Sequence, residues 1–183
     1  MRIGDRRDGY GLVTRVLHWL MAIAIPALFV LGLWMVSLDY TSPYYNLAPD
    51  IHRSAGVLLL FLLMLRFFWR IANPKPGSEE LSPFEAKASH IVHWGFYPLL
   101  LALMVSGYLI STAKGEPISV FGWFDVPAVL ALDNQETVAG QVHEILAYVT
   151  LALATVHTIA ALKHHFRDKS RILTRMWSGP PAG

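Results

Sequence analysis

The stretch that decides the fold is GQVHEILAYVTLALATVH, residues 140–157. It is almost as long as the ~20 apolar residues that a helix needs to cross the hydrocarbon of a bilayer, yet it contains His143 and His157. Ionisable groups inside a membrane segment are costly, so they indicate function by default. The two histidines are 14 residues apart, and because that is nearly four helical turns they project from one face about 21 Å apart along the axis. A single helix therefore offers a polar ligand near each membrane surface.

The composition of the whole chain is typical of a polytopic membrane protein. Of its 183 residues, 54% are hydrophobic and 15% are charged, and the mean hydropathy is +0.42, well above that of a soluble domain. Four apolar stretches reach the length of a membrane span, at roughly 12–38, 51–72, 90–112 and 138–162. We therefore predict an all-α integral membrane four-helix bundle, a single domain over residues 1–183, with an outer loop at 113–137.

Basic residues predict how this bundle is oriented, because Lys and Arg in short loops mark the cytoplasmic side. Of 15 basic residues, only Arg53 and Lys114 fall on the opposite side, so both termini are predicted to be cytoplasmic. The net charge of +2 then reflects topology, and no nucleic-acid partner is expected. The basic residues on the predicted cytoplasmic side are Arg2, Arg6, Arg7, Arg15, Arg66, Arg70, Lys75, Lys87, Lys163, Arg167, Lys169, Arg171 and Arg175.

With this topology, the histidines of the spans form pairs at two depths. His18 and His157 lie near the cytoplasmic ends of the first and fourth spans, whereas His52 and His143 lie near the outer ends of the second and fourth. Imidazole is the commonest metal ligand. A low-spin haem takes two axial ligands from opposite sides, which facing helices of a bundle can supply. The pattern suits two stacked b-type haems, although for any single histidine an interfacial polar role is the alternative.

Other residues bear on how such haems are held. The chain has no cysteine, which excludes a c-type haem attachment, a thiolate-ligated iron–sulfur cluster and any disulfide, so haem would be held non-covalently. Gly56 lies one turn after His52 and Gly107 in the outer half of the third span; both permit close approach of a porphyrin, with ordinary small-residue helix packing as the alternative. Arg15 and Arg53 lie near the two haem levels and can pair with propionates.

Further histidines lie on the predicted cytoplasmic side. His90 and His93 are three residues apart at the start of the third span, and His164 and His165 end the fourth. Histidine can donate a hydrogen bond to a quinone carbonyl and supply a proton near neutral pH, whereas interfacial snorkelling explains the same positions without function. His90 or His93 also remains an alternative to His18 as a ligand of the inner site.

Four ordered histidine motifs carry a family resemblance that covers nearly the whole chain. They are TRVLHW at 14–19, IHRSAG at 51–56, SHIVH at 89–93, and VHE at 142–144 followed by His157 and ALKHHF at 161–166. This pattern resembles the prokaryotic cytochrome b561 family.

The resemblance implies a protein of the bacterial inner membrane that transfers electrons through two haem b groups and exchanges them with ubiquinone. His52 and His143 would bind the periplasmic haem, and His18 and His157 the cytoplasmic haem. Some family members resemble superoxide:ubiquinone oxidoreductases. The predicted outer side of this chain has few basic residues, so the local charge does not favour attraction of an anionic donor such as superoxide. Whether the chain is itself such an oxidoreductase stays open.

Two other functions and several partners are consistent with the sequence. The chain can be a cytochrome b anchor for a separate dehydrogenase or hydrogenase-like subunit, or a non-haem bundle that carries a metal on the same histidines. In the outer loop, VFGWF at 120–124 and VPAVLAL at 126–132 are too short to span, so we expect them to lie in the interface as a lid over the outer haem. The expected partners are the lipid bilayer, a quinone and a periplasmic redox or lipid-binding protein, with a homodimer left open.

Overall fold

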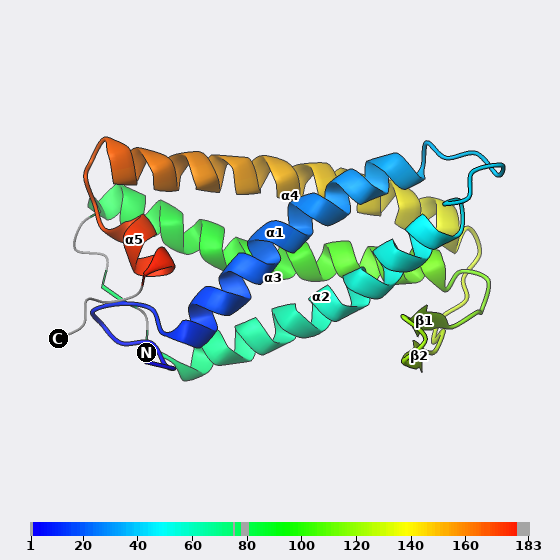
Figure 1. The fold of residues 1–183 in the computed structure, drawn as a ribbon, viewed down its shortest axis with the longest axis horizontal. Helices are drawn as coiled ribbons and strands as arrows, with labels where there is room; N and C mark the ends of the chain where they lie inside the picture. Colours follow the sequence, from blue (N-terminus) through cyan, green and yellow to red (C-terminus); the bar gives the residue numbers. More distant parts are fainter. Residues whose placement is uncertain (1, 75, 78–80, 179–183) are drawn as a thin grey trace.

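A computed structural model describes residues 2–74, 76–77 and 81–178; Lys75, one of the basic residues used to predict orientation, lies outside them. Four long helices dominate the described chain (Figure 1). A short fifth helix follows them, and a two-stranded antiparallel sheet lies between the third and fourth. The elements are α1 (Leu12–Met35), α2 (Leu47–Ala72), α3 (Pro83–Ser111), β1 (Ile118–Val120), β2 (Phe124–Val126), α4 (Gln135–Phe166) and α5 (Ile172–Trp177).

The four long helices run up and down, so that both termini lie at one end of the bundle (Figure 1). We call this end the terminal end, and the opposite end, which carries the sheet, the loop end. Helix α1 packs against α2, α2 against α3 and α3 against α4, while α1 crosses the bundle obliquely and touches α4 less extensively. Short connections between antiparallel neighbours are the usual topology of a four-helix bundle.

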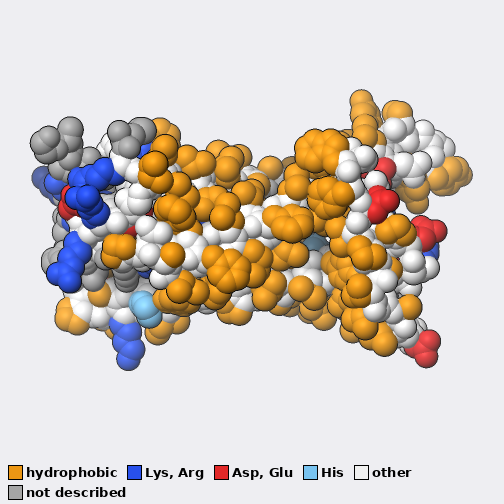
Figure 2. Space-filling view, turned by 90° about the horizontal axis from the view of Figure 1, so that it is seen from below, with side chains coloured by type: hydrophobic (Ala, Val, Ile, Leu, Met, Phe, Trp, Pro, Cys, Tyr) orange, Lys and Arg blue, Asp and Glu red, His pale blue; other side chains and the backbone are white. Residues whose placement is uncertain are grey.

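The surface is that of a membrane protein. Within the described chain, α1, α2, α3 and α4 are each long and apolar enough to cross a bilayer. Hydrophobic side chains cover the middle of the molecule, whereas Lys and Arg gather at the terminal end and acidic side chains show mainly at the loop end (Figure 2). Large apolar groups such as Phe61 and Ile145 are more than half exposed, which lipid tolerates because it is as apolar as they are.

The helices extend beyond the predicted spans at several ends. Helix α3 begins at Pro83 rather than at residue 90, because Ser82 and Glu85 form a capping box and proline is suited to the first turn. Helix α4 spans Gln135–Phe166 rather than 138–162, and α2 begins at Leu47. The predicted outer loop contains the paired strands β1 and β2, so the chain is mostly but not wholly helical.

A small apolar cluster lies in the middle of the bundle. Met21, Leu59, Leu63 and Leu100 are each 5% exposed or less, and they pack together from α1, α2 and α3. Along their helices these residues lie between the histidines of the loop end and those of the terminal end. The cluster therefore separates two polar regions of the interior.

Candidate functional site

At the loop end, two histidines from different helices face each other. The rings of His52 on α2 and His143 on α4 have centroids 6.3 Å apart and planes inclined by 75°. The structure thus brings together the two residues that the sequence paired by depth.

The ring of His143 is held by groups on α3. Its Nδ1 lies 2.9 Å from the carbonyl oxygen of Leu103 and 3.1 Å from the hydroxyl of Ser106. Because a carbonyl can only accept, the proton of the neutral ring is assigned to Nδ1, which leaves Nε2 with a free lone pair. This is the usual arrangement of a metal-ligating histidine. The sequence indicated Gly107 but did not single out its neighbour Ser106.

Two glycines make room for these rings. A Cβ atom at Gly107 would lie 3.0 Å from Cε1 of His143, and one at Gly32 would lie 3.3 Å from Cε1 of His52. Gly32 was not predicted as a site residue, since it lies on α1 far from any histidine in the sequence. Gly56 does not make room for a histidine ring in this way, because no described atom comes within 4 Å of where its Cβ would be. Helix α2 therefore borders open space one turn after His52.

At the terminal end, three imidazoles lie close together. His157 on α4 faces His18 on α1, with centroids 6.4 Å apart and planes inclined by 70°. His93 on α3 is nearer to His157, at 5.1 Å, and its Nδ1 lies 2.7 Å from the carbonyl oxygen of Ser89. His90 is exposed.

Arginines lie near both histidine pairs, but their contacts differ between the two ends of the bundle. Nη2 of Arg66 lies 3.2 Å from Nδ1 of His18, and because guanidinium only donates, this nitrogen is the acceptor. Nε of Arg15 is buried and has no hydrogen-bond partner among the described residues. At the loop end, Arg53 forms an ion pair with Asp50, so its charge is already matched.

The two ends of the bundle are covered by different elements. At the terminal end, the indole nitrogen of Trp19 donates to the carbonyl of Met176 at 3.0 Å, and Trp19 makes an edge contact with Trp177 of α5. At the loop end, the hydroxyl of Ser54 on α2 donates to the carbonyl of Ser119 at 3.2 Å and accepts from the backbone of Phe121 at 3.1 Å. The sheet is therefore fastened to α2 two residues after His52.

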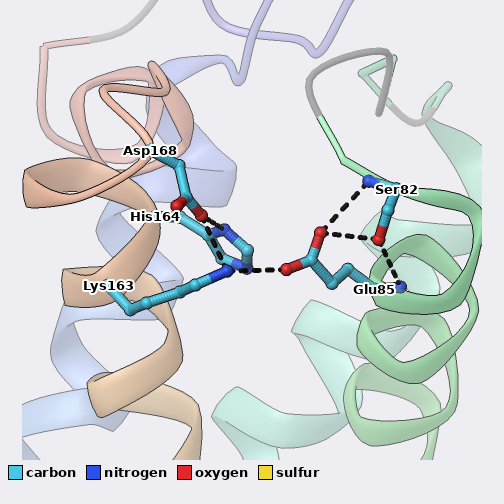
Figure 3. A network of polar contacts seen from close by, with 5 residues as sticks. All are labelled: Ser82, Glu85, Lys163, His164 and Asp168. Carbon is cyan, nitrogen blue, oxygen red and sulfur yellow. Dashed lines mark hydrogen bonds and ion pairs between the residues drawn. The ribbon is translucent and has the colours of Figure 1, made fainter.

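A polar network joins the start of α3 to the end of α4 (Figure 3). The ammonium of Lys163 contacts Glu85 at 2.7 Å and Asp168 at 2.8 Å, and His164 contacts the same oxygen of Asp168 at 2.8 Å. Glu85 also closes the capping box with Ser82. His164, predicted as a quinone contact, thus lies within an ion-pair network.

The same network has the donor set of a metal site. Ligand atoms of Glu85, His164 and Asp168 lie within 4.8 Å of one another, but the ammonium of Lys163 already contacts both carboxylates. A lysine charge in this position competes with a cation. His165 lies apart from the network, and its Nδ1 is buried without a hydrogen-bond partner in the described chain.

We predict that this network stabilises the protein in a pH-dependent manner. The hydrogen bond from Lys163 is the main reason why the pKa of Asp168 lies below its ordinary value of 3.8. A lowered carboxyl pKa contributes stability above the unfolded-state pKa, and that contribution is lost as the pH falls through the folded-state pKa. Lys163→Met should therefore lower Tm by a few degrees at pH 7, and the difference should shrink in acid as the pH falls toward the lowered pKa values of Asp168 and of Glu85, the latter being about 2.

Thermal unfolding of the detergent-solubilised protein, followed by circular dichroism between pH 3 and pH 8, measures this effect. Lys169→Met, outside the network, is the matched control and should change Tm little. An equal loss for both variants at pH 7 would contradict the role assigned to Lys163.

Comparisons with known proteins agree with this geometry. The family model described as prokaryotic cytochrome b561 matches residues 9–179. Cytochrome b561 homolog 2 of Escherichia coli K12 is 48% identical over 178 residues, which are 96% of this chain and 95% of that protein. The probable superoxide oxidase CybB of Yersinia pestis is 28% identical over 170 residues, 91% and 94% of the two chains.

A further relative is cytochrome b561 homolog 1 of Escherichia coli K12, 27% identical over 165 residues, which are 87% of this chain and 92% of that protein. Each of these relatives matches over most of both chains, and the residues that the family model matches include the four long helices. The protein therefore belongs to the prokaryotic cytochrome b561 family of haem-containing transmembrane proteins.

Proposed function

We propose that the protein transfers electrons across the membrane through two non-covalently bound haem b groups. His52 and His143 would ligate one haem at the loop end, and His18 and His157 the other at the terminal end. Haem iron supplies one-electron chemistry by changing between its ferric and ferrous states. The protein's own residues would supply the imidazole ligands, their orientation and an apolar surrounding.

The spacing of the paired imidazole rings is the observation that carries this proposal. A metal–imidazole bond of about 2.0–2.1 Å, with about 1.1 Å from the nitrogen to the ring centroid, gives about 6.3 Å between the centroids of two imidazoles that face each other across one metal ion. The two pairs have centroid separations of 6.3 Å and 6.4 Å. The 5.1 Å between His93 and His157 is too short for an iron between them, which favours His18 as the inner ligand.

Space and charge near the pairs also suit a porphyrin. The open side of Gly56 faces a region in which a flat ring can approach the helix backbone. The buried, unpartnered Nε of Arg15, one turn before His18, suits a propionate, because a buried charged donor is costly without an acceptor. At His18, ligation through Nε2 would require Arg66 to release Nδ1, whereas His143 already has the protonation that a ligand needs.

Helix α4 would couple the two sites. It runs without interruption through His143 and His157, so the 14-residue spacing becomes about 21 Å along its axis. Haems held at these two levels would carry electrons between the two ends of the bundle, which the apolar cluster of Met21, Leu59, Leu63 and Leu100 separates.

We propose further that the terminal end faces the cytoplasm of a bacterium and that the loop end faces the periplasm. The positive-inside rule supports this orientation, because the basic side chains gather at the terminal end (Figure 2). Ubiquinone is the proposed exchange partner within the bilayer. Superoxide is the donor suggested by the name of the Yersinia pestis relative, although Arg53 is paired with Asp50 and attracts an anion less than a free guanidinium would.

We predict that removal of one ligand removes one haem. His143→Ala and His157→Ala should each retain about half of the haem, because a low-spin site needs both imidazoles. Haem is quantified by the pyridine haemochrome assay, and the reduced-minus-oxidised spectrum and its redox titration separate the two centres. The unchanged protein should show b-type α-bands, and a spectrum without them would refute the proposed function.

His93→Gln is the matched control for the inner site. It removes the imidazole nearest to His157, but it should leave both haems bound because His93 is not a ligand in our assignment. If His93→Gln lost one haem and His18→Gln kept both haems, the inner ligand would be His93 rather than His18.

We also predict that Gly56→Leu expels the haem of the loop end and preserves the helical fold. A Cβ atom at Gly56 would meet no described atom within 4 Å, so we expect the leucine side chain to extend into the space assigned to the porphyrin. Helical content by circular dichroism should be unchanged while the haem content falls by about half. Ala152→Leu, at an exposed position of α4, should retain two haems. Full haem content in Gly56→Leu would contradict the placement of the porphyrin.

The direction of electron flow is tested separately with oxidised protein in proteoliposomes. Ubiquinol or enzymatically generated superoxide is added, and haem reduction is followed in a stopped-flow spectrometer. We expect ubiquinol to reduce the haems and superoxide to do so more slowly, since the loop end shows mainly acidic side chains (Figure 2). Reduction by superoxide at a rate near the diffusional limit would overturn this order.

A further inference from the structure

The β1–β2 hairpin of the outer loop lies against α2 (Figure 1), and its tip has a fixed shape. Phe121 and Gly122 have φ of 49° and 72°, and two successive positive φ are what a type I′ turn requires. This backbone is uncommon for a residue with a bulky side chain such as Phe121. Two hydrogen bonds hold it: the amide of Phe121 donates to the hydroxyl of Ser54 at 3.1 Å, and that of Trp123 donates to the carbonyl of Val120 at 2.9 Å.

The hairpin has an apolar side and a polar side. Paired residues of an antiparallel ladder point to the same side, and successive residues point to opposite sides. Val120 pairs with Phe124 and lies on the same side as Ile118, and both Val120 and Ile118 are buried. Ser119 pairs with Asp125 on the opposite side, where both are exposed. The apolar side therefore faces α2 and the polar side faces away from it.

A contact with α2 gives the depth of the tip. The rings of Phe124 and Phe61 make an edge contact, with centroids 6.3 Å apart. Phe61 follows Arg53, the last charged residue at the loop end of α2, by eight residues, which is about 12 Å along the helix axis. Since α2 is apolar enough to cross a bilayer and a charged side chain stays near the membrane surface, Phe61 lies within the hydrocarbon. The tip therefore reaches below the level of the lipid headgroups.

The tip continues the apolar outer surface of α2. Phe61, Leu65 and Phe68 are each more than half exposed, and their spacing of four and three residues places them along one face of the helix. Beside this face the tip presents three aromatic side chains that are themselves exposed: Phe121, Trp123 and Phe124. Trp123 is the most exposed of them, at 72%. The surface of the tip is thus an extension of the surface that α2 turns toward lipid.

Charge is placed away from this surface. Residues 120–124, VFGWF, carry no charged group, and Asp125 points to the polar side of the ribbon. Three exposed aromatic rings without a charge between them are unfavourable in water, whereas Trp is favoured at the boundary between headgroups and hydrocarbon. A two-stranded ribbon also has edges with unpaired backbone groups, which hydrocarbon does not tolerate. These two requirements are met together if the tip is inserted and the strands lie among the headgroups.

We propose that residues 121–124 anchor the hairpin in the loop-end leaflet of the membrane, with Phe121, Trp123 and Phe124 in contact with phospholipid acyl chains. Ser119 and Asp125 face the headgroups and water. Ser54 fixes the base of this anchor to α2, two residues after His52. The inference concerns a lipid contact of the protein itself and does not depend on the proposed electron transfer.

The test uses nitroxide spin labels, because the chain has no cysteine and single cysteines can be introduced without background. Haem-loaded Trp123→Cys protein is labelled and placed as single copies in nanodiscs of phosphatidylcholine. Power-saturation EPR compares collisions of the label with oxygen, which concentrates in hydrocarbon, and with a water-soluble nickel complex. We expect accessibility to oxygen to exceed accessibility to nickel severalfold.

Asp125→Cys is the matched control, because it lies in the same hairpin but on its polar side. Its label should be reached by nickel more readily than by oxygen. Ala152→Cys, exposed on the membrane-spanning helix α4, is the reference for lipid, and Glu136→Cys, exposed near the start of α4, is the reference for water. Equal accessibility ratios at Trp123→Cys and Asp125→Cys overturn the proposal.

A second variant tests the anchoring role of the native indole. With the label at Phe124→Cys, the additional substitution Trp123→Asp should raise accessibility to nickel severalfold, because a carboxylate is costly in hydrocarbon and withdraws the tip. Ser119→Asp adds the same charge on the polar side and should leave the label where it is. An equal response to both substitutions removes the anchor from Trp123.

Protection of the Trp123→Cys label from oxygen and nickel alike would place the tip against protein rather than lipid, and this outcome also overturns the proposal. The reduced-minus-oxidised spectrum of the same samples reports on the haems separately. A hairpin that fails these tests in a protein with intact b-type bands would leave the proposed electron transfer unaffected.

Discussion

The dominant constraint on this molecule is the placement of imidazoles inside a membrane bundle. Each ring must satisfy its polar atoms without water, since an unpaired polar group in hydrocarbon costs several kcal/mol. His143 meets part of this requirement through the carbonyl of Leu103 and His93 through the carbonyl of Ser89. Nδ1 of His52 is buried and has no hydrogen-bond partner among the described residues. A metal between facing rings would satisfy the nitrogens that the protein leaves free, and the helix spacing, the glycines and the apolar middle are all compatible with that arrangement.

The two ends of the bundle meet this constraint differently. The loop-end pair has glycines against both rings and a hairpin fastened beside it through Ser54. The terminal end has a third imidazole, an arginine on His18 and an ion-pair network that joins α3 to α4. The terminal end is thus richer in titratable and charged groups, whereas the loop end carries the β1–β2 hairpin. This asymmetry is what a protein needs if it handles different reactions at its two faces.

Much of the fold was predictable because it depends on patterns that are local in the sequence. Apolar length defines a span wherever it occurs, so the four helices and the pairing of histidines by depth followed from spacing alone. Helix ends were less predictable: Pro83 and Glu85 continue α3 beyond its apolar part, since a capping box stabilises a polar first turn. The β1–β2 hairpin and α5 were not predicted, because such short segments form through contacts with distant residues such as Ser54 and Trp19. Gly32 and Ser106 were not singled out for the same reason, since they contact histidines on other helices.

The sequence by itself determined the class of the protein, the number of long helices, the absence of thiol ligands and the depth of each histidine. These properties follow from composition and from the rise of a helix, which do not depend on how the helices meet. Only the tertiary structure decided which of the two imidazoles beside His157, that of His18 or that of His93, lies at a separation that suits an iron. It also decided which nitrogen of His143 carries its proton. Each of these depends on side chains brought together from different helices and loops, and their distances are set by packing rather than by spacing along the chain.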